Sequence, residues 1–351
     1  IFGHFGDRMG RKTTLVVSLM TMGVGTFLIG CLPSYETIGL LSPILLLCLR
    51  MVQSFSASGE YAGAATFLAE YAPSNHRGLY CSLVPASTAT GLLIGSALAT
   101  FMFMTWGHDS SFVTEWGWRI PFLLAGPLGF IAHYIRTKLE DSPAFVKMEE
   151  GNKEAEHPTH LVFKKYRKRL LSSVAATMVN AVGFYLVLTY LPTYLTSYTS
   201  MEASQAQLAT DIALIAYLLI IFGSGTLSDK VGRRRMLLTA CVAFIVLSIP
   251  CFLMLGTASL PIVIVAELIM CVTLSLNDAN IACYQAEMFP TEVRYTGAAL
   301  GSNIAYVVFG GTASFVATAL IDATGNGLMP AFYMMDIRAV AGVTLFSTAH
   351  D

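Results

Sequence analysis

The stretch Gly3-His-Phe-Gly-Asp7-Arg8-Met-Gly10-Arg11-Lys12 stands directly before a long apolar segment. It returns 222 positions later as Gly225-Thr-Leu-Ser-Asp229-Lys230-Val-Gly232-Arg233-Arg234. A second motif agrees, because Glu70-x-x-Pro-Ser-x-x-Arg77 matches Glu287-x-x-Pro-Thr-x-x-Arg294 at a spacing of 217. Two motifs repeated at nearly one spacing predict that the chain consists of two similar halves.

The segments around these motifs are strongly apolar. Of the 351 residues, 55% are hydrophobic and 12% are charged, whereas a soluble domain carries roughly 25% charged residues. Four runs of 27 to 32 residues contain no Asp, Glu, Lys or Arg, and a helix crosses a bilayer with roughly 20 apolar residues. We therefore predict an all-α membrane protein with about ten complete spans, at 13–32, 40–71, 80–105, 118–136, 170–199, 207–228, 236–256, 260–288, 295–321 and 327–347.

Several other classes of protein are disfavoured. The net charge of −1 argues against a polyanion binder, so no nucleic acid partner is expected. Seven Cys without a C-x-x-C pair or a neighbouring His pair predict neither a disulfide framework nor a zinc site. The sequence lacks H-E-x-x-H, G-x-S-x-G and a P-loop, so we expect a non-enzymatic protein without metal or cofactor.

The basic residues indicate the orientation of the chain. When loops are counted alternately, 18 of the 21 Lys and Arg fall on one side, which the positive-inside rule assigns to the cytoplasm. Both repeated motifs lie on that side in both halves, so the repeat is parallel. We predict an N-terminal bundle at 1–136, a polar cytoplasmic linker at 137–169 and a C-terminal bundle at 170–351.

The repeat also bears on where the chain starts. The span near 170 lacks an upstream counterpart unless roughly fifty residues precede Ile1, enough for one span and most of a second. The expected architecture is therefore two pseudo-symmetric six-helix bundles, N-terminally truncated in this sequence.

The repeated motifs join carboxylates to basic clusters at the cytoplasmic ends of spans. We expect charge pairs among them, with Glu70 and Glu287 as acceptors, to hold helix ends together. A network that breaks when helices part can bias a conformational equilibrium. The alternative is that the basic residues only mark topology. The predicted gating residues are Gly3, Asp7, Arg8, Gly10, Arg11, Lys12, Glu70, Arg77, Asp229, Lys230, Gly232, Arg233, Glu287 and Arg294.

Charged groups inside spans are the candidate transport site, because each costs at least ~2.5–3.5 kcal/mol at a helix centre. Arg50, Gln53 and Glu60 fall on one helix face. Glu60 lies near mid-span, where burial favours the neutral carboxyl and suits reversible proton binding. A structural Glu60, permanently paired with a basic neighbour, is the alternative. Asp278 is a second protonation candidate, or else a residue of helix packing.

The other candidate site residues are polar or aromatic: Tyr61, Asn180, Tyr185, Tyr190 and Asn280. Aromatic faces such as those of Tyr185 and Tyr190 attract quaternary ammonium groups, although Tyr in a span more often serves packing. Pairs of Gly four residues apart, at 59/63, 91/95 and 297/301, predict close approach of helices.

The opening motif and its second copy resemble the signature of the major facilitator superfamily, in which G-x-x-x-D-R-x-G-R-K joins two spans. Arg50-Met-Val-Gln53, Gly117-Trp-Arg119 and Glu140-Asp-Ser-Pro143 are similar to motifs of its metabolite:proton symporter family, and Pro33-Ser-Tyr-Glu36 to the proline/betaine branch. The resemblance implies a major facilitator fold and proton-coupled symport by alternating access, in the bacterial inner membrane.

Charge inside the spans gives a separate expectation for the solute. A di- or tricarboxylate needs several cationic partners, and Arg50 is the one cation that this map places well inside the first bundle. One cation, nearby carboxylates and Tyr faces suit a small zwitterion such as proline or glycine betaine. Symport of 2-oxoglutarate, citrate or shikimate is the alternative, and a non-transporting receptor a further one. The expected partners are the solute, protons and the lipid bilayer; a single copy would suffice.

Overall fold

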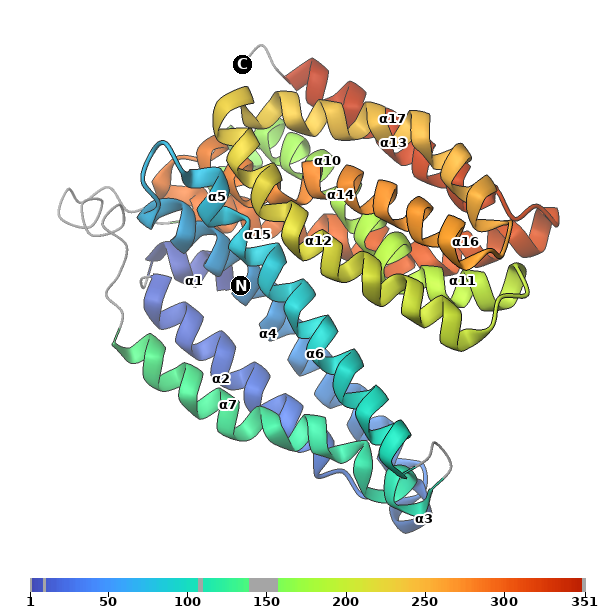
Figure 1. Ribbon diagram of the computed structural model, residues 1–351. Helices are drawn as coiled ribbons and strands as arrows, with labels where there is room; N and C mark the ends of the chain where they lie inside the picture. Colours follow the sequence, from blue (N-terminus) through green and yellow to red (C-terminus); the bar gives the residue numbers. More distant parts are fainter. Residues whose placement is uncertain (1, 9–10, 107–109, 139–156, 349–351) are drawn as a thin grey trace.

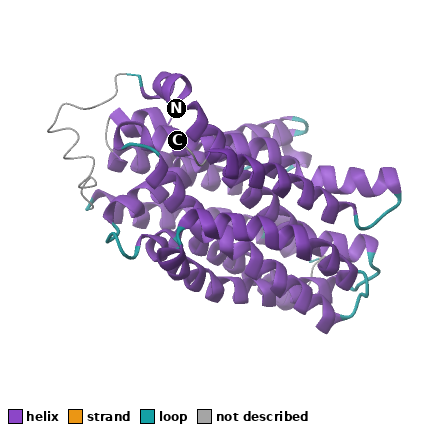
Figure 2. Ribbon diagram, turned by 90° about the horizontal axis from the view of Figure 1, so that it is seen from above, coloured by secondary structure: helices purple, strands orange, loops and turns teal. Residues whose placement is uncertain are grey.

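The computed structural model describes residues 2–8, 11–106, 110–138 and 157–348 (Figure 1). Every regular element in these ranges is helical, as Figure 2 shows. The elements are α1 (Phe2–Arg8), α2 (Arg11–Gly30), α3 (Tyr35–Ile38), α4 (Leu41–Tyr71), α5 (Arg77–Cys81), α6 (Leu83–Trp106), η1 (Val113–Gly117), α7 (Arg119–Thr137), α9 (Pro158–Lys165), α10 (Arg167–Phe184), η2 (Tyr185–Tyr190), α11 (Leu191–Tyr198), α12 (Ala203–Val231), α13 (Arg233–Leu255), α14 (Leu260–Met288), η3 (Thr291–Val293), α15 (Arg294–Ala305), η4 (Tyr306–Gly310), α16 (Gly311–Thr324) and α17 (Met329–Ser347).

The predicted all-α membrane fold is confirmed. Within the described ranges, eight helices are long and apolar enough to cross a membrane: Lys12–Gly30, Leu41–Tyr71, Arg77–Leu98, Arg167–Tyr198, Ala203–Val231, Arg233–Leu255, Leu260–Met288 and Thr291–Thr324. The other two predicted spans, at 118–136 and 327–347, coincide with the 19-residue helices α7 and α17.

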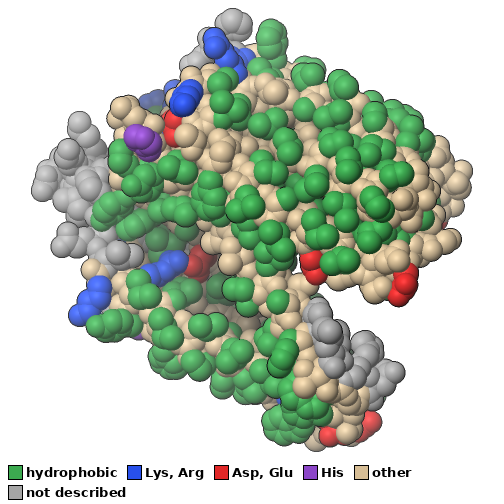
Figure 3. All heavy atoms as spheres, viewed as in Figure 1, with side chains coloured by type: hydrophobic (Ala, Val, Ile, Leu, Met, Phe, Trp, Pro, Cys, Tyr) green, Lys and Arg blue, Asp and Glu red, His purple; other side chains and the backbone are tan. Residues whose placement is uncertain are grey.

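Helix α13 illustrates why these segments lie in lipid. It opens with three basic residues and continues almost entirely apolar to Leu255. Phe244 and Phe252 are buried against neighbouring helices, whereas Val242 and Val246 on the opposite side are about 60% exposed. A helix that is apolar on all sides requires an apolar surrounding on its outer face. Figure 3 shows the same pattern across the molecule, whose visible surface is covered largely by hydrophobic side chains.

The two groups of helices meet at one end of the molecule. We call this the basic end; it comprises α1, α5 and the N-termini of α13 and α15. There α1 packs on α15, and α5 packs on α12 and α14. Away from the basic end, α2, α4 and α7 diverge from the helices of the second half, whereas α6 remains in contact with α12 as far as Ser96. Figure 3 shows a hollow between the halves.

The polar segment 137–169 contains helix α9, whose Val162 is fully buried with Leu170, Phe289 and Val293, so this part packs on the second half. Residues 139–156 lie outside the described ranges. One expectation about close helix contacts is wrong. Gly91 and Gly95 have no atom within 4 Å of the position of an added Cβ, so they support no close helix contact among the described residues.

Candidate functional site

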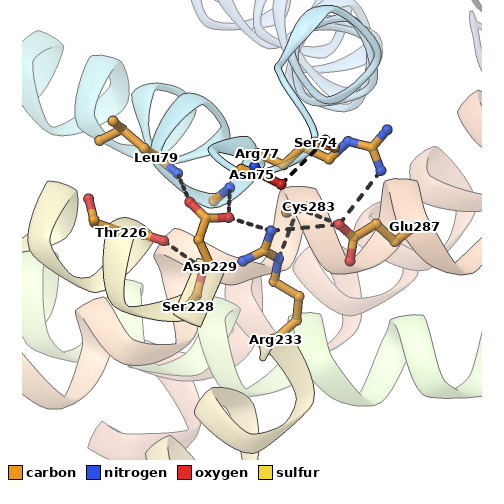
Figure 4. Close-up of polar contacts among 12 residues, drawn as sticks. Ser74, Asn75, Arg77, Leu79, Thr226, Ser228, Asp229, Arg233, Cys283 and Glu287 are labelled. Carbon is orange, nitrogen blue, oxygen red and sulfur yellow. Dashed lines mark hydrogen bonds and ion pairs between the residues drawn. The ribbon is translucent and has the colours of Figure 1, made fainter. Parts of the chain in front are cut away.

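At the basic end, Asp229 joins the two halves of the chain. Its Oδ1 accepts a hydrogen bond from the backbone N–H of Gly78 at 2.9 Å, and its Oδ2 accepts one from Leu79 at 3.3 Å (Figure 4). These are free N–H groups at the start of α5, where a carboxylate is favoured by both hydrogen bonding and the helix dipole. Arg233 binds the same carboxylate at 2.6 Å. Asp229 on α12 is thus a cap for a helix in the other half.

Asp7 makes the repeat-related contact in the opposite direction. Its two carboxylate oxygens accept hydrogen bonds from the backbone N–H groups of Tyr295, at 3.2 Å, and Thr296, at 2.8 Å, at the start of α15. Asp7 is fully buried, and the nearby hydroxyl of Tyr295 donates to the carbonyl of Gly59 at 2.6 Å. Each half therefore supplies one aspartate that caps a helix of the other half.

The ion pairs at the basic end follow the same reciprocity. Arg294 binds Glu70 at 2.8 Å, and Arg77 lies 3.9 Å from Glu287. Arg233 also lies 3.6 Å from Glu287, so this carboxylate contacts a cation from each half (Figure 4). The Glu70 side chain is 1% exposed, whereas that of Glu287 is 37% exposed, so the first pair is shielded better from solvent.

At the basic end, the backbones of the two halves lie so close together that a methyl group on Gly78 or Gly3 would clash with the other half. A Cβ built on Gly78 would lie 2.3 Å from the carbonyl oxygen of Gly225 and 2.3 Å from Ser228 Oγ. A Cβ on Gly3 would lie 2.8 Å from Cα of Thr296. The motif glycines therefore permit direct backbone contact between halves.

The remaining residues of the repeated motif play smaller parts in the described contacts. Gly232 ends α12 with a positive φ of 98°, a conformation that favours glycine, and Lys230 is exposed. Lys12 is half-buried at the start of α2. Gly10 and the side chains of Arg8 and Arg11 lie outside the described residues.

A second polar cluster is buried deeper, where α4 meets the second half. Asp278 on α14 is 2% exposed and accepts a short hydrogen bond from the hydroxyl of Tyr217 on α12. Tyr306 donates a short hydrogen bond to the amide oxygen of the fully buried Asn180. The ring of Tyr61 on α4 meets that of Tyr306 edge-on at 6.1 Å. We call these five residues the central cluster; they bring together the predicted residues Tyr61, Asn180 and Asp278.

Glu60 lies on the next position of α4 but faces into the first half. It forms a close ion pair with Arg136 at the end of α7, and Arg136 also donates to the carbonyl of Leu15 at 3.3 Å. The two side chains are about one-fifth exposed. The second carboxylate oxygen of Glu60 is buried and makes no hydrogen bond within the described part of the chain. Glu60 thus has one paired oxygen and one that can accept a proton.

Arg50 and Gln53 are apart from Glu60. Arg50 donates to Gln53 at 3.1 Å, and Gln53 donates to Thr26 on α2 at 2.8 Å. Arg50 also lies 5.7 Å from the ring centre of Phe122. Arg50 is exposed, and its contacts join α4 to α2 and α7 within the first half. It lies ten residues, about 15 Å along α4, from Glu60.

The other predicted site residues lie in the second half, outside the central cluster. Asn280 is buried and donates to the carbonyl of Leu276 on its own helix at 2.6 Å. Tyr190 is 5% exposed and shares a hydrogen bond with Thr318, in a row of rings that continues through Tyr194. Tyr185 begins the π-helical turn η2 and is half-buried. Asn280 and Tyr190 are therefore parts of the packed second half.

Sequence reasoning missed Arg136, Tyr217 and Tyr306. Arg136 ends the predicted span at 118–136, and its position in the sequence indicates only a cytoplasmic charge. A long side chain at a helix end can nevertheless reach several ångströms along the helix. Tyr217 shares its face of α12 with Thr210 and Ser224, whose small hydroxyl side chains are common in helix packing and do not point to a site. Tyr306 begins the π-helical turn η4. A π-helical turn is frequent at functional sites, but no sequence pattern signals it.

The charged residues of the last span do not meet each other. Asp336 is exposed, whereas Arg338 is fully buried, 4.0 Å from the ring centre of Phe244, and donates to the carbonyls of Met334 and Val179. Two residues apart on a helix, they point in different directions, as their spacing predicts.

Comparison with known proteins gives consistent results. The family model described as Major Facilitator Superfamily matches residues 1–314. The chain is 36% identical over 361 residues to the proline/betaine transporter of Escherichia coli strain K12, covering 99% of this chain and 72% of that protein. It is 34% identical to the ectoine/proline transporter ProP of Corynebacterium glutamicum, covering 98% and 71%.

Solved structures show the same fold at lower identity. The transporter FucP in an outward conformation superposes with a TM-score of 0.76 at 12% identity, covering 100% of this chain and 86% of that one. The xylose transporter XylE from E. coli gives a TM-score of 0.71 at 17% identity, covering 99% and 83%.

Proposed function

We propose that this chain, which belongs to the major facilitator superfamily, takes up a small zwitterion together with protons. As a member of that superfamily it is a multi-pass membrane transporter, not an enzyme. The proposed solute is proline, glycine betaine or a compound of the same charge pattern. Relatives that are named proline/betaine and ectoine/proline transporters, at 34–36% identity, support this solute class.

The contacts at the basic end support transport by alternating access. Asp7 and Asp229 each cap a helix of the opposite half, so parting of the halves at this end breaks both caps together. The ion pairs Arg294–Glu70 and Arg77–Glu287 break in the same motion. With these contacts made, the hollow between the halves is open at the other end (Figure 3). We propose that the described state faces outward and that the basic end is a cytoplasmic gate between bundles at 1–136 and 170–351.

The central cluster supports a site for the solute. A quaternary or secondary ammonium is attracted by the faces of aromatic rings and by a carboxylate. Tyr61, Tyr217, Tyr306 and Asp278 offer both, from helices of both halves. We propose that the cationic end of the solute lies here, so that its binding draws α4 toward α12 and α14.

Proton coupling is proposed to run through Glu60, with Asp278 as the second protonatable carboxyl. The ionised Glu60 neutralises the positive charge of Arg136 in a partly desolvated ion pair. Protonation of Glu60 leaves the Arg136 charge without its counter-charge. The released Arg136 would then change how α7 is held against α4. The observation that carries the proposal is a carboxylate with one oxygen paired and the other buried and free to take a proton.

Competition for uptake tests the solute class. We expect unlabelled proline and glycine betaine to displace a labelled member of the pair from the full-length protein in proteoliposomes, with 2-oxoglutarate, citrate and shikimate inactive. The described central cluster carries a carboxylate and no Lys or Arg, so a dicarboxylate would meet like charge there. Displacement by citrate or 2-oxoglutarate at micromolar concentration, with proline and glycine betaine inactive, would make the dicarboxylate alternative the correct one.

A further inference from the structure

A second buried carboxyl in the interface of α12 and α14 has no role in the function described above. Glu267 is fully buried, and its Oε1 accepts a hydrogen bond from Thr210 Oγ1 at 3.2 Å. Its Oε2 is also buried and has no hydrogen-bond partner in the described part of the chain. Glu267 lies seven residues after the start of α14, about 10 Å from its outer end.

Glu267 repeats the arrangement of Asp278. On α12, Thr210 and Tyr217 are seven residues apart, and on α14, Glu267 and Asp278 are eleven apart. Both spacings return a side chain to within about 20° of the same helix face. The two facing helices therefore present two hydroxyl–carboxyl pairs in succession, Thr210 with Glu267 and Tyr217 with Asp278.

The charged surroundings of Glu267 are acidic. Asp211, on α12, lies close enough to interact electrostatically with Glu267, and Cys271 is the titratable neighbour on its own helix. Within the described residues, neither a hydrogen bond nor an ion pair joins Glu267 to Lys, Arg or His. A second negative charge beside Asp211, away from water, is unfavourable, and binding a proton removes it.

Asp211 links Glu267 to the relative position of the halves. Its Oδ1 accepts hydrogen bonds from Ser96 on α6 at 3.2 Å and from Gln207 at 3.0 Å. Ser96 belongs to the first half, whereas Asp211 and Glu267 belong to the second. Movement of α6 away from α12 removes one hydrogen bond from Asp211 and so changes the field at Glu267.

We propose that Glu267 is a further proton-binding site of the transporter, in addition to Glu60 and Asp278, and that it is filled and emptied as the Ser96–Asp211 contact changes. In the described state its carboxylate takes a proton from a hydronium ion of the outer solution, leaving water and a neutral carboxyl. When the halves rearrange, the carboxyl returns the proton to water. The proposal deepens, and in its transport consequence rests on, the proton-coupled function proposed above.

Infrared spectroscopy of the purified full-length protein at pH 7 tests protonation without any solute. We expect a carboxylic-acid C=O band in wild type that Glu267→Gln lacks. Thr210→Val is expected to keep the band and move it to higher frequency, because the C=O of the Glu267 carboxyl loses the hydrogen bond from Thr210. Glu202→Gln, at an exposed position of the same end, is the matched control and should leave the band unchanged.

A band that is unaltered in Glu267→Gln, or unmoved in Thr210→Val, overturns the proposal. The Thr210→Val result stands even if Glu267→Gln fails to fold. In proteoliposomes, each coupled proton supports tenfold accumulation per unit of pH gradient. Glu267→Gln should therefore accumulate about tenfold less solute at one unit, with solute exchange unchanged. A wild-type band without pH-driven uptake would instead contradict the proposed function and leave the proton site standing.

Discussion

Replacing Glu60 by Gln is expected to abolish solute accumulation driven by a pH gradient while leaving the protein inserted and able to exchange solute. Gln imitates the protonated carboxyl but does not release a proton, so the cycle loses the step that couples proton movement to rearrangement. A gradient of one pH unit supports about tenfold accumulation per coupled proton. Because every proton is coupled through the rearrangement that Glu60 controls, the accumulation ratio of Glu60→Gln should fall to one. Uptake and counterflow of labelled solute in proteoliposomes measure the two quantities.

The ion pair with Arg136 supplies the control for Glu60. If Glu60 serves only to hold α4 to α7, Arg136→Gln should have the same effect as Glu60→Gln, chiefly lowering thermal stability. On our account, Arg136→Lys keeps a cation beside Glu60 and retains part of the coupling. Normal accumulation by Glu60→Gln at every pH would show that the coupled proton binds elsewhere.

Asp7→Asn and Asp229→Asn should each slow transport more than they weaken solute binding. Each aspartate accepts two backbone N–H bonds from a helix of the other half. Hydrogen bonds to a charged group contribute about 1.5–3 kcal/mol, and loss of one or two kcal/mol shifts a two-state equilibrium by about 5–30-fold. The population of the state closed at the basic end, relative to the open state, should fall by that factor. Turnover and equilibrium solute binding, measured on the same variants, distinguish an effect on the gate from an effect on the solute site.

A steric substitution reaches the same gate by another route. Gly78→Ala places a methyl group against the backbone of Gly225 and should also favour the state open at the basic end. Gly91→Ala, where nothing lies within 4 Å, is the matched control. Collapse of binding affinity with preserved turnover in the aspartate variants would contradict the gate.

The repeat made much of this architecture predictable. The two spacings placed Asp7, Asp229, Glu70 and Glu287 at one end, and charge-free runs located the spanning helices, because lipid admits few charges. The hydrogen bonds that Asp7 and Asp229 accept from backbone N–H groups were not predicted, because they depend on how helix ends from different halves meet. The sequence pattern of one half does not indicate which helix end of the other half it will contact.

The sequence predicted only some residues of the central cluster. Asp278 and Tyr61 were candidates because a charge or a polar group in a span is conspicuous. Tyr217 and Tyr306 became visible only once α12 and η4 were packed against α14 and α4. In the same way, the pairing of Glu60 with Arg136 joins residues 76 positions apart, and helix periodicity relates only residues on one helix.

The most direct measurement is uptake of labelled glycine betaine and proline by the full-length protein in proteoliposomes with an imposed pH gradient, acidic outside. The account predicts accumulation above the external concentration, rising with the gradient, abolished by a protonophore and absent in Glu60→Gln. Uptake that only equilibrates the solute at every gradient, or accumulation that is indifferent to a protonophore, would contradict it.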